Sequence, residues 1–185
     1  MIYFVRHGQT DWNLVHRVQG RADIELNSTG VEQANKAKEE LKDIKFHKVF
    51  CSPLKRTRKT CEIITDEPIV FDDRLLEREL GEFEGLKREE FDIMAFWNSN
   101  SRQKFIKAET LNEIECRVSN FLDEIIKKYY GKNILVVSHG GVGIFFHNYF
   151  YGAPKDGNYL QYLSDNGVAL MFDETKLNRS AEIDT

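Results

Sequence analysis

The chain has 185 residues, which fits one domain of ordinary size. Hydrophobic residues make up 41% and charged residues 30%, and 26 Lys and Arg against 30 Asp and Glu give a net charge of −4. This balance excludes wholesale disorder, a collagen-like chain and a generally basic nucleic-acid binder. No apolar run approaches the roughly 20 residues that cross a bilayer, and the three cysteines lack the paired spacing of a disulfide framework or a zinc site. We therefore expect a cytoplasmic protein with no membrane anchor and no nucleic-acid partner.

The first half of the chain predicts two strands, each followed by a helix. Short runs of apolar, strand-forming residues predict buried strands at residues 2–5 and 48–51. Thr29 and Glu32 have the spacing of a capping box, which predicts the start of the first helix. The Ser-Pro pair that opens residues 52–64 supplies an N-cap and a first helical residue, so we expect the second helix over this range.

The second half predicts the same alternation. Thr110 and Glu113 form another capping-box pattern, which begins a long amphipathic helix. Residues 134–137 are the strongest buried-strand signal in the sequence, and a very apolar helix over 142–151 and a last strand over 167–172 follow. Strands that alternate with helices predict an α/β fold, a three-layer α/β/α sandwich with a mostly parallel central sheet.

Three predicted strands end in polar, reactive sequence. These ends are Arg6-His7-Gly8, Cys51-Ser52 and Ser138-His139-Gly140. Ligands of open α/β sheets bind beyond the carboxyl ends of the strands, so we expect two histidines and the helix after Ser52 to meet at one rim. That helix carries several basic residues, and its N-terminus offers free N–H groups and the positive end of a dipole. The rim is therefore suited to an anion.

Two histidines among fixed positive charges favour phosphate over a metal ion. Guanidinium groups would repel a divalent cation, whereas arginine binds phosphate oxygens in a forked geometry. A histidine surrounded by arginines should have a lowered pKa, which leaves it neutral at pH 7 and able to attack phosphorus. Hydrolysis also needs an acid that protonates the departing alkoxide. The candidates are four glutamates in residues 75–85, and the pattern alone does not choose among them.

Several segments, in order from residue 2 to about residue 141, together resemble the histidine phosphatase superfamily, the clan of cofactor-dependent phosphoglycerate mutases and related phosphatases. The segments are Arg6-His7-Gly8 with its extension to Asn13, scattered matches between Arg17 and Ala34, and residues 52–56, 75–85 and 137–141. The chain departs from the family pattern at Glu25, Thr57 and Lys59, and none of these departures removes a reacting group.

The resemblance implies a phosphoglycerate mutase-like fold and a role for each matching position. His7 would be the nucleophile that becomes phosphorylated, and Glu77 would be the proton donor. His139 would be a further catalytic residue that also contacts the phosphoryl group. The phosphate-binding residues would be Arg6, Asn13, Arg56 and Gly140. The resemblance implies neither a cofactor nor a metal.

We expect residues 1–175 to form a single histidine phosphatase domain, with a short lid segment around 86–110 and a tail over 176–185. Mutases of the family carry a longer insertion that keeps a bisphosphate from water, so a short lid favours hydrolysis of the phosphohistidine. The sequence thus predicts a phosphomonoester hydrolase that acts on a small phosphorylated metabolite. The alternatives are a 2,3-bisphosphoglycerate-dependent phosphoglycerate mutase, a metal-dependent hydrolase and a non-catalytic phosphate-binding protein, and the oligomeric state stays open.

Overall fold

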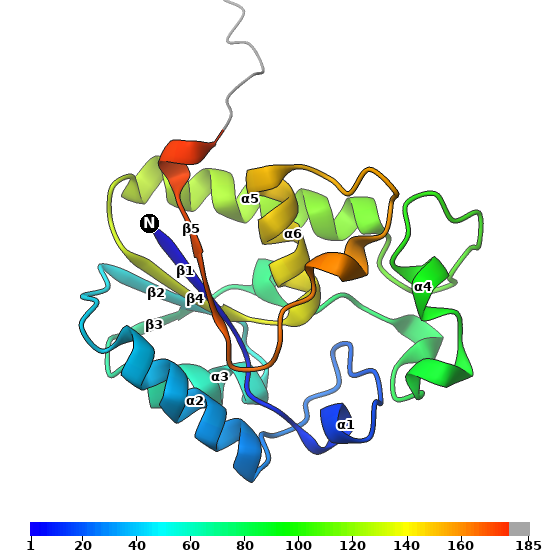
Figure 1. Ribbon diagram of the computed structural model, residues 1–185, viewed down its shortest axis with the longest axis horizontal. Helices are drawn as coiled ribbons and strands as arrows, with labels where there is room; N and C mark the ends of the chain where they lie inside the picture. The colour runs from blue at the N-terminus through cyan, green and yellow to red at the C-terminus, as the bar shows by residue number, and fades with distance from the viewer. Residues whose placement is uncertain (178–185) are drawn as a thin grey trace, which may run out of the picture.

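A five-stranded sheet in the order β3-β2-β4-β1-β5 forms the centre of the protein, as seen in a computed structural model that describes residues 1–177 (Figure 1). The strands are β1 (Ile2–Arg6), β2 (Lys48–Cys51), β3 (Ile69–Phe71), β4 (Ile134–Ser138) and β5 (Ala169–Phe172). The first four strands run parallel, and β5 pairs with β1 in the antiparallel direction. The mostly parallel sheet is therefore confirmed. Strand β3 was not predicted, because this three-residue edge strand has two half-buried side chains and an exposed one, Phe71.

Helices cover both faces of the sheet (Figure 1). The longer helices are α2 (Ser28–Leu41) and α3 (Lys55–Ile64) on one face, and α5 (Leu111–Tyr129) and α6 (Gly140–Tyr151) on the other. Neighbouring strand residues point to opposite faces, so Val5 packs with the α2 and α3 side of the core while Phe4 packs with the α5 and α6 side. The structure thus confirms a three-layer sandwich.

Short helices occupy the loops around the sheet. They are α1 (Asp11–Leu14), α4 (Ile93–Phe96) and the single 3₁₀ turns η1 (Asp73–Leu75), η2 (Gly81–Phe83), η3 (Arg88–Glu90), η4 (Tyr159–Tyr162) and η5 (Glu174–Lys176). The segment predicted to be a lid, residues 86–110, contains η3 and α4. Within the described residues, no helix combines the length and the apolarity needed to cross a membrane.

Two of the three predicted N-caps are wrong. Helix α2 begins at Ser28 because Asn27 caps it by accepting a hydrogen bond from the Gly30 N–H at 2.9 Å. Helix α3 begins only at Lys55, with no side-chain cap at Leu54. Only the predicted capping box between Thr110 and Glu113, at the start of α5, is confirmed. The N-cap prediction failed at the second site because the Ser52 hydroxyl has another partner, described below.

The C-terminal boundary differs slightly from the predicted one. Glu174 is buried and forms an ion pair with the N-terminal amine at 2.6 Å, which holds η5 against the body of the protein. Lys176, the first residue of the predicted tail, belongs to this turn. Leu177 follows this turn as its C-cap, and the rest of the predicted tail, residues 178–185, lies outside the described part of the chain.

Candidate active site

The carboxyl ends of three adjacent strands bring the two histidines together. Strands β2, β4 and β1 are neighbours in the sheet, and His7 donates its backbone N–H to the Ser138 carbonyl at 2.9 Å. The ring centroids of His7 and His139 are 5.3 Å apart, with the rings edge to face. The two imidazoles therefore share one site at the rim where the sequence predicts an anion.

The hydrogen bonds of His7 determine which ring nitrogen carries the proton. Nδ1 lies 2.7 Å from the carbonyl oxygen of Gly8, which can only accept, so Nδ1 is protonated. Nε2 is then unprotonated, and its lone pair accepts a hydrogen bond from Arg56 Nε at 3.3 Å. Burial, with the Arg56 and Arg6 charges, holds the pKa of His7 well below its ordinary value. His7 is therefore a neutral imidazole whose Nε2 is available as a nucleophile at pH 7.

Two buried arginines, Arg56 and Arg6, lie near His7 and lower its pKa. Arg56 is fixed by bonds to the carbonyls of Ala22 and Gly20 at 2.6 and 2.8 Å. Arg6 donates through Nη1 to the Ser164 carbonyl, while its buried Nε has no partner in the described structure. Burial lowers the pKa of each arginine to about 10, so both stay charged at pH 7. The other basic residues of α3, which are Lys55, Arg58 and Lys59, are exposed.

His139 is buried behind the site and faces Ser52. Its Nε2 lies 2.7 Å from Ser52 Oγ, and its Nδ1 is buried with no partner among residues 1–177. Burial is the largest cause that holds the pKa of His139 well below its usual value, followed by the Arg56 charge. Ser52 thus orients the second histidine. The sequence analysis missed this role because a Ser-Pro pair is also a helix-start signal.

Glu77 lies against the start of α6. Its Oε1 accepts from the Arg78 N–H at 2.8 Å, and its Oε2 accepts from the Gly141 N–H at 3.1 Å. A Cβ at Gly141 would lie 2.2 Å from Glu77 Oε1, so only glycine allows this close approach. Of the four glutamates in residues 75–85, Glu77 is the one whose side chain enters the site.

A cavity of about 290 Å³ joins these groups. Six of the seven predicted site residues line it, namely Arg6, His7, Asn13, Arg56, Glu77 and Gly140, and His139 lies just behind the lining. The sequence analysis did not assign three further polar lining residues, Arg17, Gln19 and Arg88, to the site. Arg17 and Gln19 fall among the family matches, and Arg88 among the basic residues of the lid segment, so a signal was present for each.

The charge of the cavity suits an anion. Four arginines and a single carboxylate are among its described lining residues. Asn13 uses its Oδ1 to accept from the Thr10 N–H at 3.1 Å, which leaves its amide N–H₂ for a ligand. No cluster of three or more His, Cys, Asp or Glu side chains suited to a metal occurs in residues 1–177. The donors present match the oxygens of a phosphoryl group.

Lowering the pH from about 7.5 to about 5.5 is expected to lower the free energy of unfolding through both histidines. The pKa values of His7 and His139 are depressed in the folded protein, so the unfolded chain takes up protons that the folded protein does not. Each histidine then lowers the free energy of unfolding by up to about 1.4 kcal/mol for every pH unit below pH ~6.5. Urea unfolding at several pH values measures this effect. In the variant His7→Gln, the free energy of unfolding should depend less steeply on pH. An unchanged slope would contradict a lowered pKa for His7.

Comparison with known proteins places this site in a family. Residues 2–168 match the model of the histidine phosphatase superfamily (branch 1). The "Uncharacterized phosphatase PhoE" of Bacillus subtilis is 39% identical over 142 residues, which cover 75% of this chain and 71% of that protein. The "Probable phosphoglycerate mutase GpmB" of Erwinia tasmaniensis is 33% identical over 148 residues, with 75% and 69% covered.

A solved structure agrees with these matches. Phosphoserine phosphatase from Entamoeba histolytica, in complex with 3-phosphoglyceric acid, superposes with a TM-score of 0.80. The two proteins are 25% identical, and the alignment covers 91% of this chain and 87% of that one. The family model spans nearly all of the described residues, and β1 with the start of the site lies inside it. The chain belongs to the histidine phosphatase superfamily.

Proposed function

We propose that this protein hydrolyses phosphomonoesters through a covalent phosphohistidine on His7, with Glu77 as the proton donor. The observation that carries the proposal is the state of His7. Its Nε2 is unprotonated and lies beside the charged guanidinium of Arg56, and His7 is one of the residues that line the cavity. A neutral nitrogen nucleophile next to fixed positive charge is what attack on a phosphoryl group requires.

The reaction then proceeds in two steps. In the first, His7 Nε2 forms a bond to phosphorus while the P–O bond to the ester oxygen breaks, and the Glu77 carboxyl group donates a proton to that oxygen. In the second, water attacks the phosphohistidine, Glu77 takes a proton from the water, and the P–N bond breaks to release phosphate. Arg6, Arg56 and Asn13 bind the phosphoryl oxygens. Gly140 leaves room for the Arg6 side chain, because a Cβ at this position would come within 3.2 Å of it. His139 lies behind these groups and is held by Ser52.

Three observations support a small metabolite as the substrate and hydrolysis over transfer between metabolites. The cavity of about 290 Å³ has room for a phosphoryl group and a small organic body. The lid segment of residues 86–110 is short, so water reaches the phosphohistidine more readily than under a longer cover. The Entamoeba relative binds 3-phosphoglyceric acid, a small phosphorylated acid, in its crystal structure.

We also infer a cytoplasmic location, which suits three cysteines that are all unpaired.

Phosphate release from a panel of phosphomonoesters, after exhaustive chelation of metal ions, tests the proposal. We expect full activity after chelation, because the reaction as proposed uses only side chains of this chain. A metal-dependent hydrolase would lose activity, and a non-catalytic phosphate-binding protein would turn over no ester. With 3-phosphoglycerate and catalytic 2,3-bisphosphoglycerate, formation of 2-phosphoglycerate faster than phosphate release would overturn hydrolysis in favour of a mutase.

A further inference from the structure

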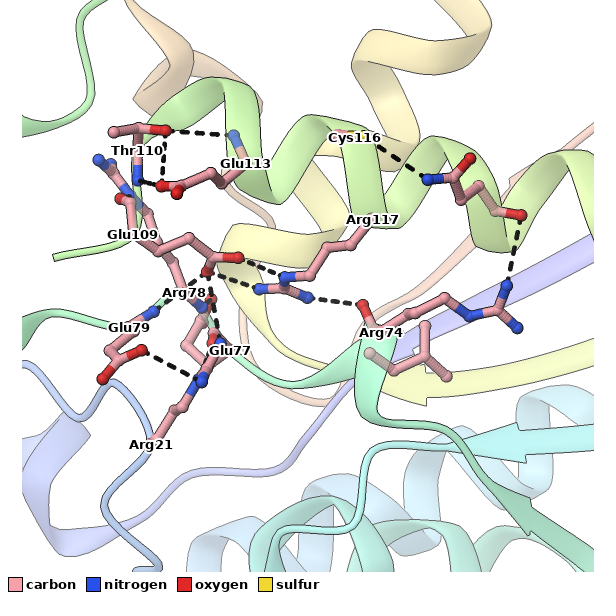
Figure 2. A network of polar contacts seen from close by, with 12 residues as sticks. Arg21, Arg74, Glu77, Arg78, Glu79, Glu109, Thr110, Glu113, Cys116 and Arg117 are labelled. Carbon is pink, nitrogen blue, oxygen red and sulfur yellow. Dashed lines mark hydrogen bonds and ion pairs between the residues drawn. The ribbon is translucent and has the colours of Figure 1, made fainter.

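A network of ion pairs and hydrogen bonds lies between α5 and the segment that carries Glu77 (Figure 2). Its central pair is Glu109 and Arg117. The Arg117 Nε and Nη2 donate to the two carboxylate oxygens at 2.5 and 2.9 Å, a two-pronged, charge-assisted geometry. The side chains of Glu109 and Arg117 are only 9% and 16% exposed. Neither residue lines the cavity that contains His7.

The pair binds the main chain on both sides of Glu77. Before Glu77, the Arg117 Nη1 donates to the Arg74 carbonyl at 2.6 Å. After Glu77, the Glu109 carboxylate accepts from the Glu79 N–H at 3.2 Å, and the Glu109 N–H donates to the Glu79 carbonyl at 3.0 Å. One ion pair therefore anchors the chain at two points that bracket the proton donor.

Arg78 connects the same pair to the wall of the cavity. Its Nε donates to the Glu109 carbonyl and its Nη1 to the Phe96 carbonyl, each at 2.8 Å. Its guanidinium lies over the rings of Phe96 and Trp97, at 3.7 and 4.7 Å from their centroids. Trp97 lines the cavity, and the Arg78 N–H binds the Glu77 carboxylate. The network thus holds the acid and the wall beside it in one arrangement.

Glu77 needs such anchors because regular secondary structure does not hold it. Residues 76–80 lie between η1 and η2, outside any helix or strand. The Glu77 carboxylate itself is bound by two backbone N–H groups, one of them from its own neighbour Arg78. Its position therefore follows the path of the chain from Arg74 to Glu79. A general acid that is displaced by about 1 Å loses much of its effect.

We propose that Glu109 and Arg117 are a positioning pair for the proton donor. They fix the path of residues 74–79 so that the Glu77 carboxyl group can reach the leaving oxygen, and they touch neither the substrate nor His7. This inference rests on the proposed role of Glu77 as the acid. It predicts that damage to the pair reproduces the kinetic signature of a lost acid, although both residues lie outside the cavity.

The test uses the variants Arg117→Met and Glu109→Gln in the full chain. The quantity measured is kcat/KM, which reports phosphoryl transfer to His7, for p-nitrophenyl phosphate and for an alkyl phosphate. A nitrophenolate leaves without a proton, whereas an alkoxide needs one. We expect kcat/KM to fall about 10- to 100-fold more for the alkyl ester than for the aryl ester, within the range that a general acid contributes. Arg117→Lys keeps the positive charge but cannot form the two-pronged hydrogen bonds to Glu109. This variant serves in the same assay if Arg117→Met does not fold.

Two controls separate positioning from a general loss of stability. Glu174→Gln weakens another ion pair, between the N-terminal amine and the buried Glu174 at 2.6 Å, which lies at the end of β1 opposite His7. This variant should leave the ratio of the two kcat/KM values unchanged. In the background of Glu77→Ala, Arg117→Met should add no further leaving-group dependence, because the acid is already gone.

The outcomes are distinguishable. Equal losses for both esters in Arg117→Met, or an additive loss in the double variant, overturn the positioning role while the proposed function stands. If the unmodified protein hydrolyses neither ester, or if Glu77→Ala itself shows no leaving-group dependence, the proposed function fails and the inference fails with it.

Discussion

The variant His7→Ala is expected to lower phosphatase turnover by roughly 10⁴-fold or more, since removal of a nucleophile leaves no route to the covalent intermediate. The fold should survive the change. The ring is neutral and buried, so its removal leaves no charge uncompensated, although it opens a space beside Arg56. The arginines remain in place, and we therefore expect the variant still to bind phosphomonoesters. Turnover, thermal unfolding and binding of a phosphomonoester measure the three effects separately.

The covalent intermediate gives a second readout for His7. Rapid acid-free quenching during turnover of a radiolabelled ester should trap label on the unmodified protein and none on His7→Ala. His47→Ala is the matched control, because His47 is exposed and lies outside the cavity, and it should behave like the unmodified protein. Label that persists on His7→Ala would place the nucleophile elsewhere and would falsify the assignment.

The convergence of the site could be predicted because it depends on topology. His7, Ser52 and His139 each follow a strand, and the rule that parallel strands end at one edge is independent of side-chain detail. Buried runs such as residues 134–137 identify the strands with little ambiguity, because all five residues of β4 are buried. The same pattern could not show that β5 is antiparallel, since a four-residue strand with only Phe172 buried fits either direction.

Side-chain partners were harder to predict than strand ends. Ser52 could cap a helix or bind a distant histidine, and the choice depends on His139, which is 87 residues away. Arg56 and Lys55 are neighbours in the sequence, yet one is buried against His7 and the other is exposed. Only the packing of α3 on the sheet distinguishes them. The residue pattern alone offered four basic residues in this helix, and the resemblance to a family selected Arg56 among them.

The residue pattern is even less able to select the proposed proton donor, Glu77. Four glutamates within residues 75–85 have the same chemistry, and no periodicity ranks them. The structure distinguishes Glu77 by the approach of Gly141, which has no side chain to block the carboxylate, and by the N–H groups that bind its two oxygens. The approach of Gly141 and one of the two N–H groups come from α6, which begins more than 60 residues later in the chain, at Gly140. Contacts at such sequence separation have no local signal.

The variant Glu77→Ala is expected to lower kcat/KM for an alkyl phosphate by about 10² to 10⁴, the range that a general acid contributes. For p-nitrophenyl phosphate the loss should stay within about tenfold, because that leaving group departs as an anion. Alanine is preferred over glutamine here. Both Glu77 oxygens accept from backbone N–H groups, and the amide nitrogen of glutamine would set a donor against one of them.

Glu82→Gln is the control for Glu77→Ala, because Glu82 belongs to the same acidic segment but is exposed and lies outside the cavity lining. Its kcat/KM values should match those of the unmodified protein for both esters. The second chemical step provides an independent check. In the proposed mechanism Glu77 also takes the proton from the attacking water. Glu77→Ala should therefore accumulate phosphohistidine with the aryl ester, seen as a burst of nitrophenolate before slow turnover. If both esters lose activity equally and no burst appears, Glu77 acts by shaping the cavity, and another group supplies the proton.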